Sequence, residues 1–178
     1  MIATRANRIL KKHCETLSPR LYRLAWSWTH DADAAQDLVQ ETWTRAFERA
    51  AQLQDEIRLQ AWLSRIMVNL HRDRIRARRE HLDISAMELA GEEGADDLAS
   101  RHDEIQRVRD AIARLPDDQR MVLTLVDLME LSYAEVSETL GIPIGTVMSR
   151  LSRSRQLLKK TLSKAQQGTV VARLRRAK

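Results

Sequence analysis

The chain has 178 residues, of which 43% are hydrophobic and 31% are charged, with only five glycines and three prolines. This composition is typical of a soluble, helix-rich protein and argues against a β-rich or disordered chain. The net charge is +5, the one cysteine excludes an intrachain disulfide, and the sequence offers no run of about 20 apolar residues for a membrane span.

The first residues lack the continuous apolar segment of a signal peptide, because Arg5, Arg8, Lys11 and Lys12 interrupt it. We therefore expect the protein in the cytoplasm. Cys14 has no second cysteine or metal-spaced histidine beside it, which favours an ordinary small side chain over a redox centre.

Residues 1–80 show helical periodicity in several pieces. Ser18 followed by Pro19 has the form of an N-cap with proline in the first turn, which predicts a helix that begins there. Its apolar positions recur at i, i+3, i+4 and i+7, namely Leu21, Leu24, Ala25 and Trp28. One face of this helix should therefore be buried.

Two further helices are expected in the same region. Asp31 or Asp33 can cap the first of them. A polar break over residues 52–58 precedes the second, which carries Trp62 on its apolar face and runs into a block of arginines. Residues 81–103 then lose the periodicity, contain two glycines and carry acidic side chains with Arg101 as the one Lys or Arg, which predicts a mobile linker.

Residues 104–165 resume the helical pattern. Ser132 and Glu135 have the spacing of a capping box, so a helix should begin sharply at Tyr133. It should stop at Gly141, which can adopt the left-handed conformation of a tight turn. A second helix near Ile144 completes the pattern of a DNA-reading helix-turn-helix, although a purely structural helix pair can be capped in the same way.

The second of these helices is the candidate for base reading. Hydroxyl and guanidinium groups on its outer face can address base edges and phosphates in a major groove. The residues expected there are Thr146, Ser149, Arg150, Arg153 and Ser154.

Basic residues are segregated along the chain. From Thr139 to the end there is no Asp or Glu, and residues 72–79 form a second basic block in which Asp73 is the one acidic residue. Blocks of one sign often meet a polyanion, because each neutralised phosphate releases a counterion, although either block alone could also be a solvated helix face. A basic tail, residues 166–178, ends the chain.

The sequence contains no Gly-rich phosphate loop, paired catalytic carboxylates or metal-spaced His and Cys cluster. We therefore expect no enzymatic activity, no catalytic residue, no cofactor and no metal.

Three segments of the C-terminal half resemble region 4 of the bacterial sigma factors. They are Leu115–Arg120, Leu131–Val136 and Gly141–Leu151. In that family, region 4 reads the minus-35 promoter element. Taken alone, these segments could equally be the DNA-binding end of a LuxR-like regulator whose N-terminal half senses a signal or dimerises.

The N-terminal half favours the sigma factors. Asp37–Trp43 with Arg45 and Ala46 resembles region 2.2, and Ala61–Ile66 with Asn69, Leu70, Asp73 and Arg74 resembles regions 2.3 and 2.4. Both resemblances occur in the right order. The chain is therefore similar to the extracytoplasmic-function (ECF) sigma factors, which are all-α: a region 2 helical bundle and a region 4 helix-turn-helix joined by a flexible linker.

The resemblance implies roles for particular residues. Asp37, Gln40 and Glu41 would dock on the β′ clamp helices of core RNA polymerase, and region 4 would meet the β flap. The polar break would capture a flipped base, and Trp62 is interpreted as core rather than as a stacking platform. The minus-10 element would be handled by Arg65, Asn69, Asp73, Arg74 and Arg76. The resemblance also implies an anti-sigma factor as a partner, besides promoter DNA.

Overall fold

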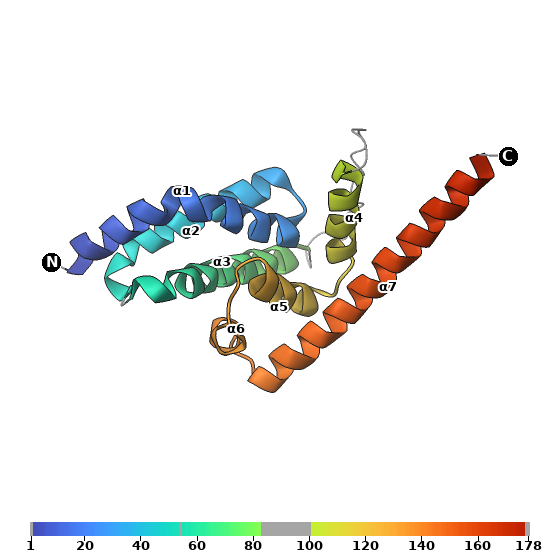
Figure 1. Cartoon of the computed structure of the whole chain (residues 1–178). Helices are drawn as coiled ribbons and strands as arrows, with labels where there is room; N and C mark the ends of the chain where they lie inside the picture. Colours follow the sequence, from blue (N-terminus) through green and yellow to red (C-terminus); the bar gives the residue numbers. More distant parts are fainter. Residues whose placement is uncertain (1, 54, 83–100, 177–178) are drawn as a thin grey trace.

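The computed structural model describes residues 2–53, 55–82 and 101–176, with side chains for residues 5–53, 55–78 and 106–163. Within those residues the chain is helical and contains no strand. The helices, shown in Figure 1, are α1 (Ile2–Thr29), α2 (Ala32–Glu48), α3 (Leu59–Leu82), α4 (Arg101–Ala113), α5 (Asp117–Asp127), α6 (Tyr133–Leu140) and α7 (Ile144–Arg176), with short 3-10 turns η1 (Ala50–Gln52) and η2 (Glu56–Arg58) between α2 and α3.

Helix α1 runs through Pro19, so the prediction of a helix beginning at Ser18 is wrong. The Ser18 hydroxyl donates to the carbonyl of Cys14 at 2.6 Å and accepts from the indole Nε1 of Trp43 at 3.0 Å. Buried Leu17 and Leu21 lie on either side of the proline. Packing of one continuous apolar stripe therefore outweighs the backbone hydrogen bond that proline removes.

Helices α1, α2 and α3 form the first bundle, in which α2 packs against both of the others. Asp31 caps α2, because its carboxylate accepts from the backbone N–H of Ala34 at 2.7 Å. The side chains of Leu38 and Leu63 are completely buried in this bundle. Asp31, one of the two expected caps, therefore caps α2.

Helices α4 to α7 form the second group, and α7 packs against the other three. Ser132 and Glu135 make both hydrogen bonds of the capping box at the start of α6. Gly141 ends α6 with φ +67°, a left-handed conformation that favours glycine. The helix-turn-helix, α6 and α7, is present as the sequence predicts.

Helical structure extends into both ends of the expected linker, because α3 continues to Leu82 and α4 begins at Arg101. The remainder of that linker, residues 83–100, lies outside the described residues. Helix α7 continues to Arg176 and so includes most of the basic tail.

The two groups of helices pack against each other through one continuous hydrophobic core. Trp28, at the end of α1, is only 6% exposed, and its Nε1 donates to the hydroxyl of Thr124 on α5 at 3.0 Å. The indole also lies against the ring of His71 from α3, with ring centroids 5.1 Å apart. Trp28 therefore joins elements from three parts of the chain.

Arg120 lies beside this contact and is buried on α5. Its guanidinium donates to the carbonyls of Leu115 and Ser27 and to the carboxylate of Asp117, and it contacts Nε2 of His30. Burial, and next the charge of Arg120, lower the pKa of His30. The imidazole therefore stays neutral, and its Nε2 can accept a hydrogen bond from Arg120.

Three more contacts join the groups of helices. The Arg72 guanidinium of α3 donates to the carbonyl of Leu140, at the end of α6, at 3.0 Å. Arg20 of α1 forms an ion pair with Glu130 in the turn after α5. The guanidinium of Arg109 on α4 lies over the ring of Trp26, 5.1 Å from its centroid.

Burial at this interface lowers the pKa of His71 to about 4; the charge of Asp117 opposes that shift, and those of Arg120, Arg74 and Arg72 add to it. The unfolded chain takes up this proton near pH 6.5, so it binds more protons than the folded chain between about pH 6.5 and 4. Stability is therefore lost as the pH falls through that window.

We predict that acidification from pH 7 to pH 5 costs wild type about 2 kcal/mol more unfolding free energy than the variant His71→Phe. The variant keeps a ring against Trp28 but has no group to titrate. Urea unfolding at both pH values measures the difference. The same pH dependence in both proteins would contradict this role for His71.

Candidate functional site

The outer face of α2 carries the residues expected to bind polymerase. Asp37 and Gln40 are exposed, whereas Leu38 and Thr42 on the opposite side are fully buried. Glu41 is half-buried at the edge of this face. The structure thus brings all three expected residues together on one accessible surface.

Arg74 joins this surface to the residues expected at the minus-10 element. Its guanidinium donates to the carboxylate of Glu41 at 3.0 Å and to the carbonyl of Ala34 at 3.2 Å. Arg45 lies 3.9 Å from the same carboxylate group. Arg74 is therefore half-buried between α2 and α3. It holds the two helices together and is also a candidate DNA contact.

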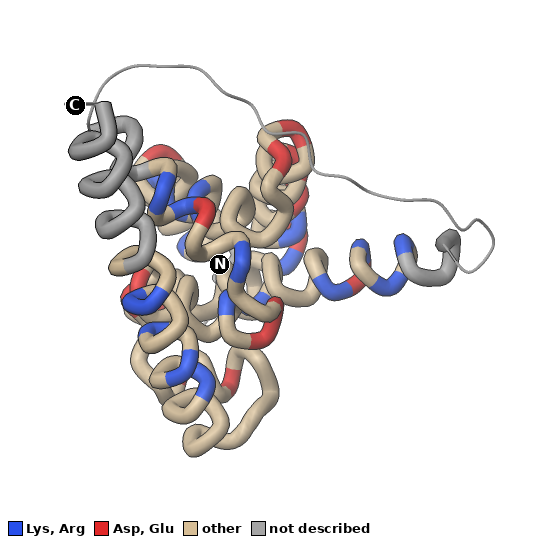
Figure 2. Tube along the Cα trace, turned by 90° about the vertical axis from the view of Figure 1, so that its right-hand side faces the viewer, with Lys and Arg blue, Asp and Glu red and all other residues tan. Residues whose placement is uncertain are grey.

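The other expected minus-10 residues line the outer side of α3. Arg65, Asn69, Asp73 and Arg76 are all exposed, and Asp73 and Arg76 form a loose ion pair at 3.8 Å. Figure 2 shows Lys and Arg gathered along the last described turns of α3 and along α7. These two basic surfaces correspond to the two blocks found in the sequence.

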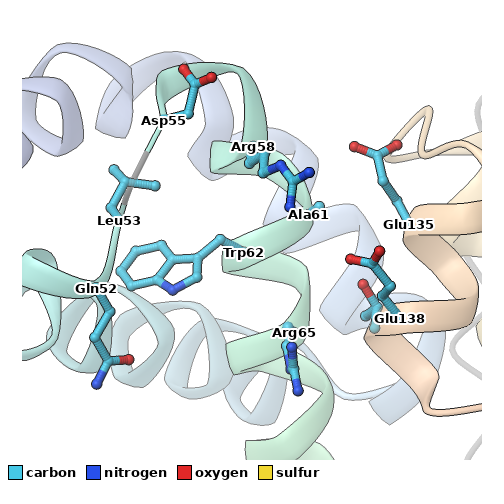
Figure 3. Close-up of a pocket in the computed structure, with 10 residues that line it drawn as sticks. Gln52, Leu53, Asp55, Arg58, Ala61, Trp62, Arg65, Glu135 and Glu138 are labelled. Carbon is cyan, nitrogen blue, oxygen red and sulfur yellow. The ribbon is translucent and has the colours of Figure 1, made fainter.

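A cavity of about 230 Å³ lies where the first bundle faces α6 (Figure 3). The indole of Trp62 points into it from α3, so this half-buried ring is both packed against the core and open to the cavity. Its other charged and polar lining residues are Gln52, Asp55, Arg58, Arg65, Glu135, Glu138 and Thr139. The polar break expected to hold a flipped base therefore forms part of a real cavity.

The turn beside this cavity is held by residues that the sequence did not single out. Glu56 accepts from Nζ of Lys12 at 3.0 Å and lies 2.6 Å from Nε2 of His13, both on α1. The hydrogen bond with His13, and then that from Lys12, lower the pKa of the Glu56 carboxyl. Ile57 at the tip is 85% exposed. Because these partners are more than 40 positions apart, sequence spacing could not reveal them.

The expected base-reading residues of α7 differ in their exposure to solvent. Ser149 and Arg153 are exposed, and Thr146 is half-buried. Arg150 pairs with Asp118 of α5 at 2.7 Å. Ser154 is fully buried and donates to the carbonyl of Leu151, so its place on the reading face is wrong: at this point the helix turns its side chain into the core.

Other residues share the exposed face of α7 with Ser149 and Arg153. They are Met148, Ser152 and Gln156, all exposed and at helical spacing. The 3.6-residue period, counted outward from buried Val147 and Leu151, could have identified them from the sequence.

Both halves of the chain match models of known protein families. Residues 14–81 match the family model Sigma-70 region 2, and residues 105–158 match Sigma-70, region 4. The ECF RNA polymerase sigma factor EcfG of Rhodopseudomonas palustris is 36% identical over 140 residues, covering 79% of this chain and 77% of its own. The chain belongs to the ECF RNA polymerase sigma factors.

Two further sigma factors are similar to this chain. The ECF sigma factor SigW of Bacillus subtilis is 31% identical, with 80% of this chain and 83% of SigW covered. The sigma factor RpoE from Bartonella quintana, solved in complex with the anti-sigma factor NepR, matches with a TM-score of 0.73 and 28% identity over 86% of this chain and 96% of RpoE.

As a sigma factor, the protein is a promoter-directing subunit of RNA polymerase rather than an enzyme. The alternative of a stand-alone LuxR-like regulator is not supported, because a family match covers the N-terminal half as well as the helix-turn-helix. Among the helices in the described part of the chain, none is long and apolar enough to cross a bilayer.

Arg153 and Ser154 are neighbours on α7, but Arg153 is exposed and Ser154 is buried. Substitution of each residue therefore tests which of them contacts DNA. Arg153→Ala should lower minus-35-dependent run-off transcription roughly tenfold, because it removes an exposed guanidinium worth about 1 to 3 kcal/mol at a base or phosphate. Ser154→Ala should leave transcription nearly unchanged, since that buried hydroxyl donates to the carbonyl of Leu151 within its own helix. A loss in Ser154→Ala equal to that in Arg153→Ala would refute this assignment of the reading face.

Proposed function

We propose that this sigma factor grips core RNA polymerase through the exposed face of α2, with Asp37, Gln40 and Glu41 meeting the β′ clamp helices. The observation that carries the proposal is the split of α2 into a buried apolar side and an accessible polar side. The Arg74–Glu41 ion pair fixes this face relative to α3. Polymerase binding and minus-10 recognition would then share one rigid unit, with region 4 meeting the β flap.

The first bundle, residues 1–80, would open and hold the minus-10 element, and residues 104–165 would read the minus-35 element. The exposed outer side of α3 and the cavity beside Trp62 support the first assignment, since extruding a base costs a few kcal/mol that a pocket can offset. The exposed basic face of α7 supports the second. Residues 81–103 would connect the two, and residues 166–178 would add basic charge.

We further propose that the protein acts in the cytoplasm and is held inactive by an anti-sigma factor. The likeness to RpoE, which was solved with NepR bound, supports such a partner. A partner that covers the polar face of α2 would compete directly with polymerase. An excess of it should abolish promoter-specific transcription.

The test is run-off transcription with purified core enzyme and a promoter library. Wild type should support transcription, and Asp37→Arg should reduce it at least tenfold, because a positive charge replaces a carboxylate at the docking face. The matched control is Glu15→Arg, which makes the same change of charge at an exposed site on α1.

Two results would count against the proposal in different ways. Transcription that does not respond to wild-type protein would overturn the promoter-directing function itself. Full activity in Asp37→Arg would overturn only the docking face on α2. Equal losses in Asp37→Arg and Glu15→Arg would show that net charge, not the face, is responsible.

A further inference from the structure

The exposed face of α7 carries an apolar side chain among its polar ones. Met148 is 54% exposed, although Val147 next to it is completely buried. It lies in the first turns of α7, which begins at Ile144. In a helix-turn-helix, the N-terminal residues of the second helix contact base edges. Met148 is therefore placed where this helix would meet the bases, and its thioether offers no charge and only a weak hydrogen-bond acceptor.

Met148 borders a shallow hollow of about 390 Å³ between α7 and the start of α6. Tyr133, the first residue of α6, lines the other side and is 39% exposed, and buried Leu151 also contributes. The lining is mainly apolar, and its charged residues, Arg155 and Lys159, are both cations. A small apolar group attached to a polyanion matches both of these properties.

Two ion pairs fix the rotation of α7 and with it the direction of Met148. Arg150 pairs with Asp118 at 2.7 Å. Arg155 pairs with Asp127, also at 2.7 Å. Both carboxylates belong to α5, so α7 is held on either side of the hollow. The hollow is therefore formed before any DNA arrives, and little ordering is needed to bind a group there.

Met148 continues the surface expected to read the minus-35 element. Residues three and four positions apart are neighbours on a helix, so Ser152 adjoins both Met148 and Ser149. Ser149 and Ser152 are exposed, as is Arg153. One helix face thus presents hydroxyls, a guanidinium and a thioether side by side. In the major groove, the C5-methyl group of thymine is the apolar group among hydrogen-bonding ones.

We propose that Met148 is a specificity-determining residue: with Tyr133 it forms an apolar contact for the methyl group of one thymine in the minus-35 element. The inference rests on the proposed function and deepens it, because it names the base that one position of the reading face selects. An arginine at this position would instead select guanine, through two hydrogen bonds to its edge.

Replacing thymine by deoxyuridine tests this contact, because it removes the methyl group and leaves every hydrogen-bonding group of the base pair in place. The promoter is one selected from the library by run-off transcription, and each thymine of its minus-35 element, on either strand, is replaced in turn. Holoenzyme made from the full chain and core polymerase is titrated with each fluorescent duplex. In wild type, deoxyuridine at one position should weaken binding roughly fourfold, the factor that corresponds to burial of one methyl group.

Three variants of α7 test whether Met148 makes this contact. Met148→Ala should bind the thymine and deoxyuridine duplexes equally, whereas Met148→Leu, which keeps a large apolar side chain, should retain most of the difference. Leu157→Ala is the matched control, since it also truncates an exposed apolar side chain. Leu157 lies about two and a half turns further along α7, on the opposite side of the helix, so this variant should keep the full difference.

Several results would overturn the inference. They are a selected minus-35 element without any A·T pair, a wild type that binds every duplex equally, a difference that survives in Met148→Ala, and a difference that is lost equally in Leu157→Ala. If the difference survives in Met148→Ala but disappears in Thr146→Ser, the methyl group of Thr146 makes the contact instead. Weaker binding of core polymerase by Met148→Ala, with base selection intact, would assign the hollow to a protein partner.

Failure of the proposed function gives a different result. Run-off transcription would then select no promoter from the library, whatever side chain stands at Met148. A promoter that is selected and transcribed, but whose binding does not depend on any thymine methyl group, would overturn only the role of Met148.

Discussion

The buried contact between Trp28, Thr124 and Arg120 joins the two groups of helices at the centre of their shared core. Thr124 accepts from Trp28 and donates to the carbonyl of Arg120, so one hydroxyl links the end of α1 to the first turns of α5. Arg120 in turn satisfies the carbonyls of Ser27 and Leu115. Removing any partner would leave a buried polar group unpaired, which costs about 1 to 3 kcal/mol. The two groups of helices thus meet in an orientation that pairs the indole of Trp28, the hydroxyl of Thr124 and the carbonyls of Ser27 and Leu115.

That contact has electrostatic consequences. It holds a buried cation, Arg120, beside two histidines whose pKa values are lowered chiefly by burial. Neutral imidazoles are compatible with the arginine, whereas protonated ones would add charge to a site that already excludes water. The interface is therefore suited to neutral pH.

The functional surfaces follow from the same arrangement. The α2 face expected to meet polymerase and the expected reading face of α7 are accessible in this arrangement, while α6 packs against α3. These two surfaces are formed by different groups of helices.

Local features of the fold were predictable from the sequence because they depend on neighbouring residues. The Asp31 cap, the capping box at Ser132 and the left-handed Gly141 are each decided within a few positions. The same holds for the apolar stripes and for the motifs that identify regions 2 and 4. Pro19 is the exception, since its helix is continued by packing against residues far along the chain.

By itself, the sequence determined that the chain is helical, which family it belongs to and which face of α2 is polar. Tertiary structure alone decided that Arg74 and Arg150 are held by carboxylates on other helices and that Lys12 and His13 support the turn at Glu56. The physical reason is the distance along the chain over which each interaction acts. Caps and periodicity depend on residues a few positions apart in one helix, whereas these ion pairs join helices that meet only after the chain has folded.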